Sequence, residues 1–154
     1  NLQVDGLFNR TDFKNIDCTT DARVLTAGNR YFSAVAQPGD MTLQDPSAAG
    51  IGARIIFIVD VVSTTSAYTI TSTDPVFFDA DSRIFAGLTN TTAGYTLQAK
   101  PNGTTNEIIT NPNSAARWGI GTTLEFVATD STHWAVYGYL APSEANPATA
   151  AFSG

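Results

Sequence analysis

The residues that could do chemistry in this chain are few, and the only histidine is the first to consider. His133 stands in D-S-T-H-W-A-V-Y-G-Y-L, residues 130–140, next to Trp134. A Ser-His or Cys-His nucleophile would need this side chain as its base, because the chain has one histidine. D-S-T has the composition of a turn, and the residues after it alternate as in a strand. We therefore interpret His133 as a turn residue at the mouth of a hairpin, and we expect the protein not to be an enzyme.

An acidic run, D-P-V-F-F-D-A-D at residues 74–81, is the candidate for metal binding. In an extended strand Asp79 and Asp81 project from the same face, and with Asp74 they could begin a calcium site. The run lacks the alternating oxygen ligands and the glycine of a calcium loop, which favours a solvated acidic turn. Zinc and iron sites lack their His and Cys ligands. We expect no metal and no other cofactor.

The single cysteine, Cys18, cannot form an internal disulfide. It lies beside an aspartate rather than in the electropositive surroundings that lower a thiol pKa. We expect it to take no part in chemistry.

Aromatic side chains suggest carbohydrate binding as an alternative. Tyr137 and Tyr139 fall on one face of the last predicted strand, and Trp134 and Val136 fall on the other. Two exposed rings could stack on a sugar, although aromatic pairs in strands more often belong to a core or an interface. The candidate glycan contacts are Tyr95, Trp118, Tyr137 and Tyr139.

The composition restricts the classes of partner. At 154 residues the chain fits one domain that can bury a core without disulfides or metal. Eight basic residues against 14 acidic ones give a net charge of −6, which argues against nucleic acid as a partner. The longest apolar run, I-I-F-I-V at residues 55–59, is far short of the ~20 residues that a membrane span needs. A charged fraction of 14 % with many Thr, Asn, Ser and Gly residues is typical of all-β extracellular or virion proteins.

Short β-type runs separated by Gly, Pro, Asn and Asp follow one another from Arg23 onward, as in a sandwich or barrel. The pattern predicts strands at Arg23–Leu25, Tyr31–Ala36, Met41–Leu43, Ala53–Val62, Ala67–Thr71, Val76–Phe78, Gly94–Gln98, Glu107–Thr110, Thr123–Ala128 and Trp134–Leu140, and single helical turns at residues 47–49 and 113–116. We expect an all-β fold with a single antiparallel β-sandwich over residues 23–140.

The two ends of the chain do not follow this pattern. Residues 1–22 are apolar without sustained periodicity, and apolar residues in an irregular segment need a surface to lie against. Prolines exclude the Ala- and Pro-rich residues 141–154 from central strands. We expect an N-terminal arm over 1–22 and an extended C-terminal tail over 141–154, packed on their own core or on a neighbouring subunit.

Three segments together resemble a known family. They are V-L-T-A-G-N-R-Y-F-S-A-V-A at 24–36 with M-T-L-Q-D-P-S-A-A-G-I-G-A-R-I-I-F-I-V at 41–59, S-A-Y-T-I-T-S at 66–72, and L-E-F-V-A-T-D-S-T-H-W-A-V-Y-G-Y at 124–139. Over residues 24–140 this pattern resembles the small β-sandwich proteins that decorate or cement the heads of tailed bacteriophages. The resemblance implies a jelly-roll-like sandwich, usually a homotrimer, seated on the outer capsid surface of the virion and bridging adjacent major capsid proteins.

We therefore expect a capsid decoration or cement protein. Its contacts with the capsid or with other subunits would come from apolar residues of the two ends: Leu2, Val4, Leu7, Phe8, Phe13 and Phe152. An equally open interpretation is that these residues pack on their own domain. The alternative function is a host-surface or glycan-binding module of a phage tail fibre or tail-associated protein. A cellular carbohydrate-binding module detached from an enzyme is a third possibility, but it would normally carry a linker.

Overall fold

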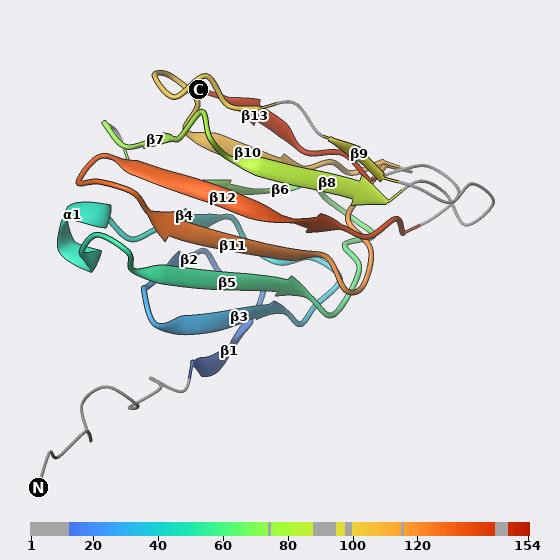
Figure 1. Cartoon of the computed structure of the whole chain (residues 1–154). Coiled ribbons are helices and arrows are strands. Elements are labelled where there is room, and N and C mark those ends of the chain that lie inside the picture. Colours follow the sequence, from blue (N-terminus) through green and yellow to red (C-terminus); the bar gives the residue numbers. More distant parts are fainter. Residues whose placement is uncertain (1–12, 74, 88–94, 98–99, 115, 144–147) are drawn as a thin grey trace, which may run out of the picture.

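Figure 1 shows the computed structural model of the chain, a stack of two β-sheets with one short helix at its end. The structure describes residues 13–73, 75–87, 95–97, 100–114, 116–143 and 148–154. Across these residues, no helix has the length and apolar character that crossing a membrane requires.

The larger of the two sheets, here the large sheet, has eight strands and lies in front in Figure 1. Its strand order is β1 (Lys14–Cys18), β3 (Asn29–Ser33), β5 (Arg54–Val59), β11 (Thr123–Ala128), β12 (His133–Leu140), β8 (Arg83–Gly87) and β9 (Tyr95–Leu97), with β7 (Phe77–Phe78) also paired to β12. The small sheet behind it has the order β13 (Ala151–Ser153), β10 (Ile108–Asn111), β6 (Tyr68–Thr71), β4 (Met41–Leu43) and β2 (Arg23–Leu25). The all-β prediction is confirmed.

The prediction of a uniformly antiparallel sandwich is wrong. Both sheets are mixed, because β1, β3 and β5 pair in parallel in the large sheet, and β2, β4 and β6 pair in parallel in the small one. From β1 to β6 the chain passes from one sheet to the other after every strand. Successive strands of the same sheet therefore run in the same direction. The hairpin of β11 and β12 then pairs antiparallel with β5 on one side and parallel with β8 on the other.

The physical reason for this difference lies in the connections. A short turn between two strands normally signals a hairpin, in which both strands belong to one sheet. Here the turn over residues 26–28 carries the chain from β2 in the small sheet to β3 in the large one. Gly28 allows this with a positive φ of 78°, and its N–H donates to the carbonyl of Arg54 in β5, the strand that pairs with β3. Inward and outward side chains alternate in the same way whichever direction the neighbouring strand runs.

The described parts of both chain ends belong to the sheets. Residues 14–18 form β1 at the edge of the large sheet, with Ile16 and Cys18 paired to Tyr31 and Ser33. Residues 151–153 form β13, which pairs antiparallel with β10. The described parts of the expected arm over 1–22 and of the expected extended tail over 141–154 thus pack on the chain's own sheets, one of the two placements expected for them. Residues 1–12 and 144–147 lie outside the described part.

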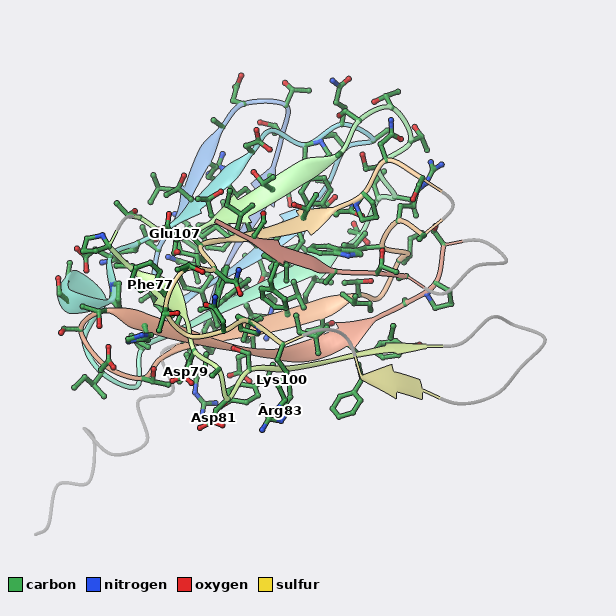
Figure 2. All side chains as sticks on the ribbon, turned by 90° about the horizontal axis from the view of Figure 1, so that it is seen from above. Phe77, Asp79, Asp81, Arg83, Lys100 and Glu107 are labelled. Carbon is green, nitrogen blue, oxygen red and sulfur yellow. The ribbon has the colours of Figure 1, made fainter. Side chains whose placement is uncertain are left out.

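The core lies between the sheets, and Figure 2 shows them from above as two layers with side chains between them. The largest fully buried side chains include Trp118, Trp134, Tyr31, Tyr68 and Phe57. In β5 the side chains alternate, so that Ile55, Phe57 and Val59 are buried while Ile56 and Ile58 face outward and are half-buried. This alternation gives the large sheet an outer side that also carries apolar residues.

The helix α1 spans Pro46–Ala49 at one end of the sandwich, and it confirms the helical turn expected at 47–49. The side chain of Asp45 caps it by accepting a 2.8 Å hydrogen bond from the backbone N–H of Ser47, and Pro46 occupies the first helical position. The second expected helical turn is wrong for its described residues, since 113, 114 and 116 lie in bends and a turn.

Candidate docking face

The outer side of the large sheet carries a line of mainly apolar residues that crosses five adjacent strands. Strand register places these residues directly next to one another, and we call them the aromatic row: Phe32, Ile58, Thr123, Tyr139 and Phe85. Each comes from an outward position of its strand, because side chains of a strand alternate between the two faces. The row therefore depends on how β3, β5, β8 and the hairpin of β11 and β12 pair, although these segments are separated in sequence.

The rings at one end of the row are open to solvent. Phe85 is 45 % exposed and Tyr139 is 36 % exposed, while Phe32, Ile58 and Thr123 are half-buried. Tyr137, which lies two residues before Tyr139 on the same face, is 39 % exposed. A group of neighbouring exposed aromatic side chains on a sheet is typical of an interaction surface.

A second line of paired residues runs beside the aromatic row, and three of its five side chains are charged. Its members, from β3 to β8, are Arg30, Ile56, Glu125, Tyr137 and Arg83. Arg54 Nη1 lies 3.1 Å from Glu125 Oε1, and Arg83 Nη2 lies 3.7 Å from Asp81 Oδ1. Figure 2 shows Asp81 and Arg83 projecting outward from the side of the large sheet. The outer face thus combines an apolar strip with an adjacent strip of arginines and a glutamate, a composition found in protein interfaces.

Two glycines shape the part of β12 that presents the tyrosines. Gly87 has no side chain where the hydroxyl of Tyr139 lies, and a Cβ at Gly87 would overlap that oxygen. Gly138, between the two tyrosines, points inward opposite Leu124, and a Cβ there would overlap the carbonyl oxygen of Thr123. The Y-G-Y spacing thus puts two rings outward while β12 stays close to β11.

Two of the proposed glycan contacts lie on this face. Tyr137 and Tyr139 lie on the outer side of β12 and are partly exposed, and Trp134 and Val136 on the opposite side are fully buried, as the alternation predicts. Tyr95 is in β9, paired with Gly87, and its side chain is outside the described part.

The fourth glycan contact, Trp118, is corrected. It is fully buried, its Nε1–H donates to the Thr149 carbonyl at 2.8 Å, and its ring meets Tyr68 edge-on at 5.7 Å. The sequence shows an isolated Trp in a turn-rich segment, and only the packing of both sheets against that segment reveals the burial.

The residues proposed for capsid or subunit contacts are divided between described and undescribed segments. Leu2, Val4, Leu7 and Phe8 lie outside the described residues. Phe13 is half-buried, and the guanidinium carbon of Arg30 lies 6.0 Å from the centre of its ring. The half-buried ring of Phe152 packs on the chain's own core, 5.7 Å from the ring of Phe78, which agrees with the alternative that this residue packs on its own domain.

The remaining candidates for chemistry lie apart from this face. Cys18 is buried, and burial raises the pKa of its thiol to about 11, so the thiol stays protonated at neutral pH. Asp79 accepts hydrogen bonds from Asp81 N–H at 2.8 Å and from Thr129 Oγ1 at 3.1 Å, which is the arrangement of an acidic turn. Asp74 lies outside the described residues, and no group of three or more acidic, His or Cys side chains suited to a metal ion occurs among those described.

A polar cleft lies elsewhere, between Thr20 and the segments 37–40 and 66–67. Two of its polar side chains have partners within the chain. Asp40 Oδ1 accepts from Thr69 N–H at 2.8 Å, and Gln37 Oε1 accepts from Thr65 Oγ1 at 3.2 Å.

Sequence alone predicted the outward tyrosines but missed Phe85, Phe32 and Ile58 as parts of one surface. The segment R-I-F-A-G at 83–87 was not predicted as a strand, and the register that aligns its Phe85 with Tyr139 exists only in the folded sheet. A comparison with family models, curated proteins and solved structures finds no match for this chain.

Proposed function

We propose that this protein is a structural virion protein that decorates the outer surface of a phage capsid and bridges major capsid protein subunits. The resemblance of residues 24–140 to head decoration proteins supports this proposal at the level of sequence. The aromatic row supports it at the level of structure. A broad face built from adjacent strands suits another protein surface, whereas small-molecule sites are usually concave and enclose their ligand.

The mechanism would be the burial of additional surface between capsid subunits. A protein that binds only the assembled shell stabilises that shell, because it must be removed before the subunits separate. In a homotrimer three such faces would act together, and avidity would strengthen a modest contact. The apolar residues Leu2, Val4, Leu7 and Phe8 would add contacts with the capsid.

The first experiment measures the mass in solution by light scattering and then co-sedimentation with purified capsids that lack this protein. We expect a trimer that pellets with capsids at a saturating ratio. Phe85→Ser removes an exposed ring from the aromatic row and should weaken binding at least tenfold, as a moderate hot spot would. Val24→Ser is the matched control, because Val24 is 58 % exposed but lies on the small sheet. Equal binding of both variants would contradict the assignment of the face.

The contribution of the N-terminal residues is tested separately. Deleting residues 1–12 leaves β1, which begins at Lys14, intact. A shortened protein that keeps its fold and oligomeric state but loses capsid binding would support an interface role. Unchanged capsid binding would remove Leu2, Val4, Leu7 and Phe8 from the interface.

Glycan binding is the second candidate, as part of a phage tail, because Tyr137 and Tyr139 expose neighbouring rings on one strand face. Aromatic rings spaced in this way can stack on sugar rings. A glycan array that shows saturable binding, lost in Tyr137→Ala and kept in Val24→Ser, would favour this function if capsids are not bound. The absence of any glycan binding would reject it.

A further inference from the structure

His133 lies between two turns that come from different parts of the chain. It is the first residue of β12 and follows the turn at residues 130–132. Its ring Nδ1 lies 3.0 Å from each carboxylate oxygen of Asp130, and its Nε2 lies 3.1 Å from the carbonyl oxygen of Gly103. The ring therefore bridges the β11–β12 turn of the large sheet and the turn at residues 101–105, which leads to β10 in the small sheet.

Both partners of the ring accept hydrogen bonds. A carboxylate has no proton to donate, and neither does a backbone carbonyl. The hydroxyl of Thr132 also lies 3.0 Å from Nδ1, but it lies 2.9 Å from Asp130 Oδ1 and donates its proton there. A neutral imidazole has one N–H and can satisfy one of the two acceptors, whereas the imidazolium has two and satisfies both. The geometry is complete only with a protonated ring.

The surrounding charges favour the same state. Asp130 faces the ring from the β11–β12 turn, and Asp79 acts on it from the turn between β7 and β8. From β7, Phe77 contributes an aromatic ring 6.2 Å away, and the turn at 101–105 contributes the neutral carbonyl of Gly103. The charged residues nearest in sequence to Gly103 are Lys100, which precedes the 101–105 turn, and Glu107, which follows it. Figure 2 labels both, together with Asp79 and Phe77.

The turn that His133 holds is a defined unit. The side-chain oxygen of Asn102 accepts hydrogen bonds of 2.9 Å from the N–H groups of Thr104 and Thr105. Gly103 packs against Ala80 with a φ of 77°, so the turn also rests on the segment after β7. The hydrogen bond between the His133 ring and the Gly103 carbonyl joins this turn to the large sheet in the part of the chain that the structure describes.

We propose that His133 is a pH-sensitive clamp: its protonated ring ties the 101–105 turn to the β11–β12 turn. Deprotonation removes the proton from Nε2, because the remaining proton stays on Nδ1 against the Asp130 carboxylate, and this releases the 101–105 turn. This clamp is independent of the function proposed for the aromatic row. It requires only the hydrogen-bond geometry of one side chain.

The direction of the pH dependence follows from two pKa shifts. Burial alone would lower the pKa of His133, but the hydrogen bonds to Asp130 and Gly103 and the charges of Asp130 and Asp79 raise it above its ordinary value. The clamp thus stabilises the closed form fully below the ordinary pKa of histidine, and this contribution is lost as the pH rises through the raised pKa. The backbone N–H of Thr132 lowers the pKa of Asp130, with a smaller contribution from the His133 ring. At the acid end, the clamp weakens when the pH falls through the pKa of Asp130.

Nuclear magnetic resonance can test this on the intact protein, because one histidine gives one set of ring signals. We expect both ring nitrogens to carry protons near pH 6, and the titration midpoint to lie above that of a free histidine. The Gly103 carbonyl carbon and the Thr104 amide nitrogen should shift with the same midpoint. Protection factors of amides 102–105 should be corrected for the intrinsic exchange rate. They should fall by up to about tenfold per pH unit between the pKa that His133 has with the turn released and the raised pKa that it has with the turn held.

Two matched variants separate the clamp from a general charge effect. Asp130→Asn removes the carboxylate at Nδ1 and should lower the midpoint of His133. Asp81→Asn makes the same change in a nearby turn, on a carboxylate that pairs with Arg83, and should leave the midpoint nearly unchanged. The proposal is overturned if His133 titrates at or below its ordinary pKa, or if the signals and protection of residues 102–105 do not follow its titration.

Discussion

Replacing Phe126 with alanine is the sharpest test of which side of the large sheet is the core. Phe126 is fully buried, and its ring lies 6.1 Å from that of Phe78. Removing a buried Phe side chain costs about 3–5 kcal/mol, because transfer free energy is lost and a cavity remains. Against the roughly 5–15 kcal/mol that stabilises a typical domain, this is a large fraction. Phe85→Ala removes the same atoms from a side chain that is 45 % exposed on the outer face, and it should cost less than about 1 kcal/mol.

Guanidinium unfolding followed by tryptophan fluorescence measures the difference, because Trp118 and Trp134 are both buried. With a slope of about 3–4 kcal/mol per molar for a chain of this size, Phe126→Ala should lower the midpoint by about 1 M. The midpoint of Phe85→Ala should stay within about 0.3 M of the original. Equal shifts for the two variants, or a larger shift for Phe85→Ala, would refute the assigned faces of β11 and β8.

Two further predictions concern the close packing of the hairpin and the buried thiol. Gly138→Ala places a methyl group against the Thr123 carbonyl and the Leu124 side chain, so we expect about 1–3 kcal/mol of destabilisation, measured as a lower thermal midpoint. The same substitution at Gly28, where a Cβ would meet nothing within 4 Å, tests the cost of its positive φ of 78° alone.

Cys18 is 1 % exposed and its pKa is about 11, so a thiol reagent at pH 8 should react at least a hundredfold faster in denaturant than with the folded protein. Comparable rates would place Cys18 at the surface.

The strands of the final hairpin were predictable because both local signals agree. Leu124, Phe126 and Ala128 alternate with outward residues, and the D-S-T turn separates them from a second alternating run. The predicted strands Arg23–Leu25, Met41–Leu43 and Thr123–Ala128 have the bounds that the structure shows. Alternation depends on the residues of one strand alone, so it can be read without knowing the neighbours.

Three strands were missed, and each is short or lies in a segment with mixed signals. Lys14–Cys18 has one apolar residue at an inward position besides Cys18, Arg83–Gly87 follows an acidic turn, and Ala151–Ser153 ends a tail rich in Ala and Pro. Each pairs with a strand that is not its neighbour along the chain: β1 with β3, β8 with β12, and β13 with β10. Such segments become strands because a partner edge is available, and tertiary context then overrides local propensity.

The sequence by itself determined the class of fold and the faces of its clearest strands, including the outward tyrosines at 137 and 139. It also placed His133 at the mouth of the final hairpin, although the residue begins strand β12 rather than lying in the turn. Tertiary structure alone decided the parallel winding of β1 to β6, the burial of Trp118 and the packing of Phe152 on its own core. It also decided the aromatic row and the contact of His133 with Gly103. The physical reason is that side-chain alternation is a property of one strand, whereas register, sheet order and contacts between distant turns depend on which strands pair.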